Sequence, residues 1–205
     1  RAFCSGADLA ARGERSVGGG EGAFTALGRH YNPMVMALAS LPVPVIAAVN
    51  GPAAGIGCSI ALVADFVIAG SSAYFLQAFV NIGLVPDGGS SWMLPRLVGK
   101  AQATRMMMLG EKISGEEAER IGLIYKSVAD DALMEEAKAL AAKLAGGPTV
   151  ALGEMKQTIR RGLEADFSTT LQYEAEAQRV AGNSKDAMEG GIAFLQKRKP
   201  EFKGT

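Results

Sequence analysis

The stretch from Val43 to Asp65 holds the residues whose order most strongly favours chemistry. An apolar run rich in β-branched residues, Val45–Val49, is followed by a turn of Asn, Gly, Pro and small residues, which leads into a second apolar run. This order predicts a buried strand, a Gly-rich turn and the start of a helix. The first N–H groups of a helix have no intrahelical partners, so such a helix start favours negative charge.

Two motifs that this stretch lacks argue against a phosphate as the ligand of the helix start. It has neither the Lys and Ser/Thr of a phosphate-binding P-loop nor the spacing of a dinucleotide fingerprint. An oxyanion that develops on an acyl group is the better candidate, because one backbone donor in a dry site contributes about 2.7–4 kcal/mol to such a transition state. A plain strand-to-helix connection is the alternative that this stretch leaves open.

A candidate acid or base lies in the loop Pro86–Gly89. Asp87 follows a predicted α/β segment, and ligands of open α/β sheets bind outside the carboxyl ends of the strands. Its apolar sequence neighbours, such as Phe79 and Trp92, indicate partial desolvation. Pro-Asp-Gly is also an ordinary turn signature, so a purely structural role is the alternative. The sole histidine, His30, falls in a predicted helix and is interpreted as structural.

The composition is that of a globular protein with a hydrophobic core. The 205 residues are 48% hydrophobic and 20% charged, and the 21 Lys and Arg balance the 21 Asp and Glu. This balance argues against a nucleic-acid partner, and no apolar run has the ~18 residues that a membrane span needs. Two cysteines are too few for a disulfide framework and too isolated for a zinc site. We therefore expect a cytoplasmic protein without a metal.

The elements that must position these residues form an α/β pattern with a helical end. Apolar runs predict strands at 45–49, 66–69, 73–76 and 123–128. Ser114 with Glu117 has the spacing of a capping box. Residues 10–22 are expected to form a surface loop. Helices are predicted at 24–41, with a kink or start at Pro33, and at 90–97, 99–109, 130–144, 150–162, 167–180 and 184–199. We divide the chain into an α/β core, 1–130, and a helical region, 131–205.

These pieces resemble the crotonase superfamily, the enoyl-CoA hydratase and isomerase family. The resemblance is carried, in order along the chain, by FCSGADL, AAVNGPAAGIGCSIALVADF, QAFVNIGLVPDGGSSWMLPRLVG, LGEKISGEEAERIGL and GGIAFLQKRKPEF. It implies a spiral fold of ββα units with a C-terminal helical trimerisation region. It also implies that roughly 60 residues of the family fold precede this sequence.

The resemblance implies a set of site residues. The backbone N–H groups of Ala7 and Ile56 would form an oxyanion hole for a thioester carbonyl, and Asp87 would be the acid and base. The two glutamates of the family's hydratases correspond to Ser59 and Phe79, which cannot exchange a proton near neutral pH. The residues that would contact substrate are Cys4, Asp8, Leu9, Gly55, Ser59, Phe79, Phe194 and Lys197, of which the last two would touch coenzyme A.

The implied function is that of an acyl-CoA isomerase. Several isomerases of the family, including the ring-opened phenylacetyl-CoA and dienoyl-CoA types, keep a carboxylate at the position of Asp87. Coenzyme A would be part of the substrate, with no separate cofactor, and the expected assembly is a homotrimer or a dimer of trimers. The alternatives are a hydratase, dehalogenase or synthase of the same family, or an inactive paralogue that binds acyl-CoA. An RNA-binding paralogue is disfavoured by the neutral charge balance.

Overall fold

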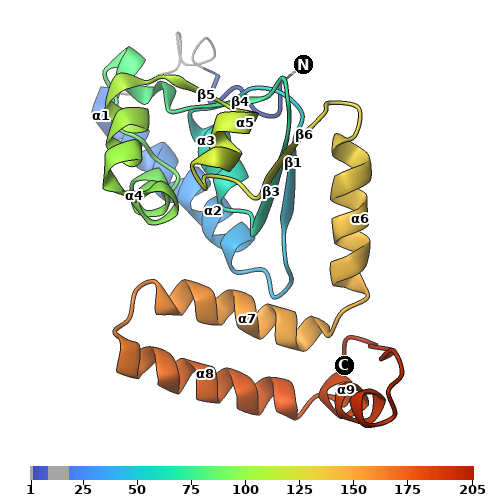
Figure 1. Ribbon diagram of the computed structural model, residues 1–205. Coiled ribbons are helices and arrows are strands. Elements are labelled where there is room, and N and C mark those ends of the chain that lie inside the picture. Colours follow the sequence, from blue (N-terminus) through green and yellow to red (C-terminus); the bar gives the residue numbers. More distant parts are fainter. Residues whose placement is uncertain (1, 9–18) are drawn as a thin grey trace. The chain divides into compact units, whose positions relative to one another are not determined.

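The chain forms two compact units. A computed structural model describes residues 2–8 and 19–205. The first unit comprises Arg1–Ala39 and Ile46–Ala137, and the second comprises Ser40–Val45 and Lys138–Thr205. Figure 1 shows the strands together with α3, α4 and α5, and the C-terminal helices α7, α8 and α9. No helix in the described part of the chain is long and apolar enough to cross a membrane.

The first unit carries all the strands of the described residues. Its strands are β1 (Ile46–Val49), β2 (Ala53–Ala54), β3 (Phe66–Gly70), β4 (Tyr74–Leu76), β5 (Lys112–Ser114) and β6 (Lys126–Val128). Its helical elements are α1 (Gly19–Ala26), the π-helix η1 (Leu27–Tyr31), α2 (Asn32–Ala39), α3 (Ile56–Leu62), the 3₁₀-helix η2 (Ala78–Ile82), α4 (Ser90–Leu109) and α5 (Gly115–Arg120). Helix α6 (Leu133–Ala145) contains the boundary between the units.

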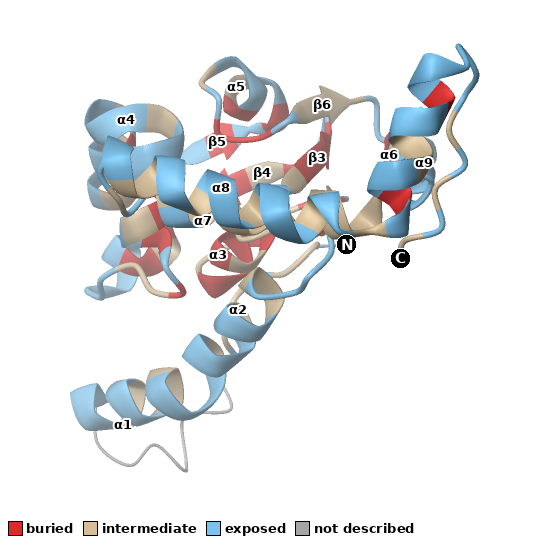
Figure 2. Cartoon of the chain, turned by 90° about the horizontal axis from the view of Figure 1, so that it is seen from below, coloured by how far each residue is buried: buried red, intermediate tan, exposed pale blue. Residues whose placement is uncertain are grey.

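The strands form two small sheets. One has the order β1-β3-β6 and is parallel throughout, with Ile46 opposite Phe66 and Ile68 opposite Lys126. The other has the order β2-β4-β5, in which β2 and β4 are parallel and β5 is antiparallel. Cys4 joins the second sheet by a parallel bridge to Ala53. Figure 2 shows buried residues concentrated in the strands and α3. The α/β class predicted from the sequence is therefore confirmed.

Several predicted elements are confirmed, and two short strands, β2 and β5, were not predicted. Strands β1, β3 and β4 match the predicted runs, and the break between 90–97 and 99–109 lies at Gly99, whose φ of 72° and ψ of 165° are not helical. Strand β2 has two residues and strand β5 has three, too short for an alternating pattern to reveal. The predicted helix at 184–199 ends earlier, because α9 (Lys185–Leu195) is followed by a left-handed residue at Lys197.

The predicted kink at Pro33 is a π-turn in the preceding residues. The Asn32 N–H donates to the Leu27 carbonyl, five residues back, instead of four. Pro33 has no N–H to donate. Helical turns of this wider kind are frequent at functional sites.

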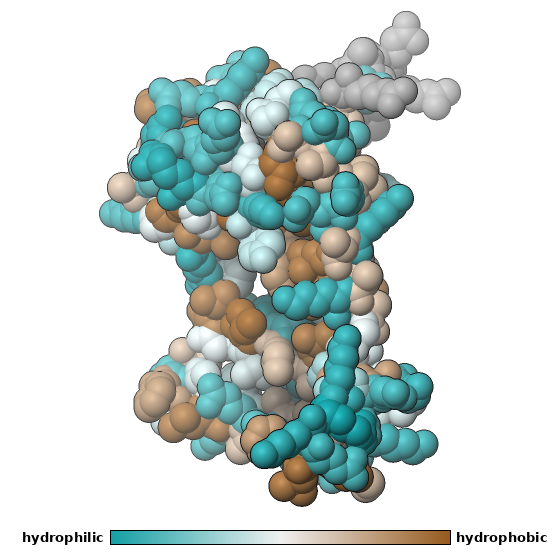
Figure 3. Space-filling view, turned by 45° about the vertical axis from the view of Figure 1, so that its right-hand side comes forward, coloured by the Kyte–Doolittle hydropathy of each residue, from teal (hydrophilic) through white to brown (hydrophobic). Residues whose placement is uncertain are grey.

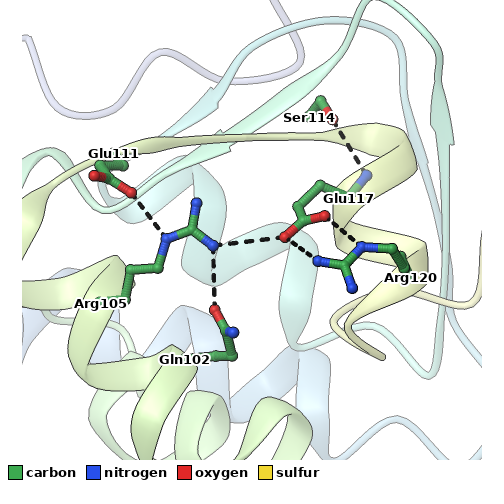
Figure 4. Close-up of polar contacts among 6 residues, drawn as sticks. All are labelled: Gln102, Arg105, Glu111, Ser114, Glu117 and Arg120. Carbon is green, nitrogen blue, oxygen red and sulfur yellow. Dashed lines mark hydrogen bonds and ion pairs between the residues drawn. The ribbon is translucent and has the colours of Figure 1, made fainter.

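Helix α5 begins as the sequence predicts but uses its glutamate differently (Figure 4). The Glu117 N–H donates to Ser114 Oγ at 3.2 Å, which is the expected N-cap. The Glu117 carboxylate accepts two bonds of 2.7 Å from Arg120 and lies 3.5 Å from Arg105. The hydrogen bonds from Arg120 hold the pKa of Glu117 below its usual value. Arg105 also binds Glu111 at 2.8 Å, which links the end of α4 to the residue before β5.

Two glycines allow three backbone segments to touch. A Cβ on Gly57 would collide with the Cys4 carbonyl and lie 2.7 Å from Cys4 Cβ. A Cβ on Gly88 would collide with Ile56 and lie 2.8 Å from Ser59 Cβ. The N-terminal segment and the Asp87 loop therefore both rest against the first turn of α3.

The second unit is helical. It contains α7 (Thr149–Gly162), α8 (Phe167–Gly182) and α9, with Asp166 and Ser184 as the N-caps of the last two. Asp186 is 2% exposed and accepts the N–H groups of Lys203 and Gly204 at 2.7 and 2.8 Å, which fixes the C-terminal segment to α9.

Both units also expose apolar side chains, visible as brown patches among hydrophilic residues in Figure 3. In the second unit these side chains are Leu41, Val43, Met155, Ile159, Leu163, Phe167, Leu171, Val180, Met188, Ile192, Phe194 and Leu195.

The first prediction concerns acid stability. The Arg198 guanidinium binds Glu189 at 2.6 and 2.9 Å and, with the Glu201 N–H, lowers the pKa of Glu189 from 4.5 to about 2. Because the folded-state pKa is depressed, this stabilisation is present above pH 4.5 and is lost as the pH falls toward 2. Glu189→Gln should therefore lower the thermal midpoint at pH 7 and have less effect at low pH. The stabilising role of Glu189 would be contradicted if the difference in thermal midpoint between wild type and variant did not change with pH. It would also be contradicted if the exposed control Glu174→Gln lowered the midpoint equally.

The second prediction concerns the contact of Gly88 with α3. Gly88 has a φ of +60°, so Gly88→Ala should lose about 1–2 kcal/mol from the left-handed backbone and about 1–3 kcal/mol from overpacking. Gly122→Ala is the matched control, because Gly122 has a φ of +76° and its nearest contact, the Leu97 carbonyl oxygen, lies at 3.8 Å. Chemical denaturation should show the larger loss for Gly88→Ala. Equal losses of unfolding free energy in the two variants would mean that the close packing around Gly88 does not contribute to stability.

Candidate active site

A pocket lies where the three segments meet. It has a volume of about 140 Å³ and is bounded by Gly6 and Ala7, by Gly55 and Ile56, and by Asp87. These residues come from the N-terminal segment, the turn before α3 and the loop before α4, all within the first unit. The sequence-predicted oxyanion-hole residues and the predicted acid/base thus line one cavity.

The Ile56 N–H is placed by the turn between β2 and α3. Gly55 is the N-cap, with a φ of 55° and a ψ of −129°, and its own N–H donates to the Leu76 carbonyl at 2.9 Å. Ile56 is the first residue of the helix, where an N–H has no intrahelical acceptor. Among the hydrogen bonds of the described residues, none uses the Ile56 N–H.

The Ala7 N–H belongs to the segment that lies along β2. The Ala54 N–H donates to the Cys4 carbonyl at 2.9 Å, and the Cys4 N–H donates to Pro52 at 3.1 Å. Gly6 has a φ of 99°, and a Cβ there would lie 3.2 Å from the Ala54 carbonyl oxygen. In residues 2–8 and 19–205 no acceptor is bonded to the Ala7 N–H.

Asp87 is held on the wall of the pocket through its main chain. Its carbonyl accepts the Ser59 hydroxyl at 2.8 Å and the Ser90 N–H at 3.2 Å. The residue is half-buried, and its Oδ1 atom is shielded from solvent. Asp87 is the single carboxylate among the described residues that line the pocket. The two residues with unused N–H groups, Ala7 and Ile56, and this carboxylate thus line the same cavity.

The remaining wall is mostly apolar, apart from Ser5 and the Tyr31 hydroxyl, and comes largely from helices. Leu27 and Tyr31, the two ends of the π-turn, line the pocket, together with Phe79, Ile82 and Leu84. Phe79 is 7% exposed, whereas Ile82 and Leu84 are about half exposed. Such a wall accepts a hydrophobic group beside the amides and the carboxylate.

Tyr31 and Leu27 were not predicted as site residues. The sequence places both only within the predicted helix at 24–41. The signal that could have found them is Pro33, because a proline distorts the preceding helical turn, and π-bulges are frequent at functional sites.

The other predicted substrate contacts are placed differently. Ser59 is fully buried and does not line the pocket, and Cys4 contributes backbone hydrogen bonds to β2. Asp8 is exposed, and Leu9 lies outside the described residues. Phe194, which is 82% exposed, and Lys197 belong to the second unit.

Cys58 is not suited to act as a nucleophile. Its thiol is fully buried, and burial raises its pKa to about 12, so it is protonated at neutral pH. In the described part of the chain, no group of three or more His, Cys, Asp or Glu side chains is arranged to hold a metal ion.

Comparison with known proteins identifies relatives along the whole chain. The family model for enoyl-CoA hydratase/isomerase matches residues 1–205. A 1,2-epoxyphenylacetyl-CoA isomerase of Escherichia coli strain K12 is 45% identical over 204 residues, which cover 100% of this chain and 78% of that protein. A short-chain-enoyl-CoA hydratase of Clostridium acetobutylicum is 39% identical, with 98% of this chain and 76% of the relative covered.

The structural comparison agrees. The crystal structure of an enoyl-CoA hydratase from Bacillus anthracis superimposes with a TM-score of 0.92 at 35% identity, over 99% of this chain and 77% of the other. A family model that matches every residue, relatives at this identity and a shared fold lead to one conclusion: the chain belongs to the enoyl-CoA hydratase/isomerase family, as the resemblance of its motifs implied.

Proposed function

We propose that the protein is an acyl-CoA isomerase in which Asp87 moves a proton next to a thioester. The observation that carries the proposal is the pocket itself, which combines two available N–H groups, at Ala7 and Ile56, with one carboxylate. The similarity to a 1,2-epoxyphenylacetyl-CoA isomerase supports it. The substrate would be an acyl-CoA thioester whose acyl group enters the apolar part of the pocket.

The proposed chemistry uses the two N–H groups to hold the thioester oxygen and Asp87 to carry the proton. The thioester carbonyl accepts the two N–H groups, which stabilise negative charge as it develops on the oxygen. Asp87 removes a proton from the carbon beside the carbonyl of a 3-enoyl thioester and gives a dienolate. The same carboxylic acid returns the proton to the fourth carbon, so the double bond moves into conjugation and no water or leaving group is involved.

The same donors could also serve an epoxide substrate. Asp87 would remove a proton from the carbon beside the thioester carbonyl, and the two amides would hold the enolate oxygen. The enolate would then expel the ring oxygen of an epoxide at the next carbon, and the carboxylic acid would give its proton to that oxygen. This isomerisation agrees with the activity named for the Escherichia coli relative.

Hydration is the second candidate, because several relatives are named as hydratases. Adding water to a 2-enoyl thioester requires groups that hold and deprotonate the water. The hydratase glutamate positions implied by the resemblance carry a buried serine and a phenylalanine, Ser59 and Phe79. The single pocket carboxylate favours proton shuttling over hydration.

Asp87→Asn tests the role of the carboxylate. The amide keeps the shape of the side chain but cannot accept a proton, so kcat for a 3-enoyl-CoA should fall by about 10²–10⁴-fold while thioester binding changes little. The conjugated product is followed by its ultraviolet absorbance, and binding is measured by calorimetry with a saturated acyl-CoA. Wild-type turnover in the variant would rule out the proposed mechanism, and faster hydration of a 2-enoyl-CoA than isomerisation would favour the second candidate.

Ile56→Pro tests one oxyanion donor without deleting the helix start. Proline is tolerated at the first position of a helix, and it removes the N–H of residue 56. We expect kcat to fall by about 10²–10³-fold. Ile56→Ala is the matched control, because it removes more of the side chain but keeps the N–H. A comparable loss of kcat in both variants would assign the effect to the side chain and would contradict the proposed donor.

A further inference from the structure

A chain of buried hydrogen bonds ends at the backbone of Asp87. The Ser59 hydroxyl lies 2.8 Å from the Asp87 carbonyl oxygen and 2.8 Å from Ser90 Oγ, and Gln77 Nε2 lies 3.0 Å from Ser90 Oγ. All three side chains are 0% exposed. They come from three elements: α3, the first turn of α4, and the residue before η2.

Each hydrogen bond in this series can have only one donor. A serine hydroxyl has a single hydrogen, and that of Ser59 is donated to the Asp87 carbonyl. Ser90 must therefore donate to Ser59, and Ser90 in turn accepts from the Gln77 amide nitrogen. The single hydrogen of the Ser90 hydroxyl also fixes the orientation of the Gln77 amide. If Gln77 Oε1 faced Ser90, it would meet a hydroxyl that already donates its hydrogen to Ser59.

The Asp87 carbonyl is thereby held from two sides. It accepts the Ser59 hydroxyl and also the Ser90 N–H, at 3.2 Å. Two glycines follow Asp87, with φ of 60° and 88°, so the loop has wide conformational freedom of its own. Without the two donors, the peptide between residues 87 and 88 could rotate and carry the carboxyl group with it.

We propose that Ser59 and Ser90 are positioning residues that hold Asp87 in register with the pocket amides. The proposal rests on the proposed function, since it matters for turnover only if Asp87 transfers the proton. It assigns Ser59 to the loop instead of to the substrate, because its one hydrogen is used by Asp87 and the residue does not line the pocket. Ser59, which the resemblance aligns with a glutamate of the hydratases, would thus hold the Asp87 loop.

The experiment measures turnover of a 3-enoyl-CoA in Ser59→Ala and Ser90→Ala, each also made in the Asp87→Asn background. Misplacement by about 1 Å can cost about 10²-fold in rate, so kcat of Ser59→Ala should fall about 10–100-fold with KM within about twofold. Ser90→Ala keeps the bond from Ser59 to Asp87 and should lose less. Ser91→Ala, on the exposed side of the same helical turn, is the matched control and should keep wild-type kcat.

The double variants separate positioning from general packing. If Ser59 acts through Asp87, Ser59→Ala should change the residual kcat of Asp87→Asn by less than about twofold. Wild-type kcat in Ser59→Ala, or the same fold-loss in both backgrounds, would overturn the positioning role. Wild-type kcat in Asp87→Asn alone would instead overturn the proposed function. Circular dichroism confirms folding, and if Ser59→Ala does not fold, Ser90→Ala decides by the same two criteria.

Discussion

The arrangement of the site depends on how closely two segments of the chain approach the first turn of α3. The N-terminal segment lies against Gly57, and the loop after Asp87 lies against Ile56 and Ser59. Both contacts exist because glycine has no Cβ. A side chain at position 57 would force the Cys4 backbone to move, and one at position 88 would displace the side chains of Ile56 and Ser59. Since Ala7, Ile56 and Asp87 sit beside these contacts, the pocket is a consequence of the packing.

Helix α3 is packed tightly enough to hold its first turn, and the segments that contact it, in place. Six of the seven residues of α3 are buried, and most of these six have small side chains: Ile56, Gly57, Cys58, Ser59, Ala61 and Leu62. A helix that is enclosed on nearly all sides cannot shift without opening cavities in its surroundings. Its first N–H is consequently held in place before any ligand arrives, and preorganised donors of this kind need no reorganisation when charge develops.

How much of this follows from the sequence depends on how local each feature is. The strand, turn and helix from Val45 onward were predicted because apolar runs and glycines mark them within a few residues. The contact of Ser59 with Asp87 spans 28 residues, and no periodicity encodes it. The resemblance to a family located Asp87, but it could not show that the Ser59 hydroxyl is bonded to that residue's carbonyl. The π-turn that brings Tyr31 to the pocket had only Pro33 as a signal.

The serine at position 59 and the loop of Asp87 fit each other in a way that excludes a longer side chain. The Ser59 hydroxyl already lies 2.8 Å from both the Asp87 carbonyl oxygen and Ser90 Oγ, so its side chain points at the loop. A glutamate in the same rotamer would place one more carbon and two carboxylate oxygens beyond the present Oγ position. It would collide with those oxygens or place a buried charge among neutral groups. The loop would have to withdraw to admit it. With the side-chain rotamer that Ser59 has here, a carboxylate at position 59 and the present Asp87 loop therefore exclude each other.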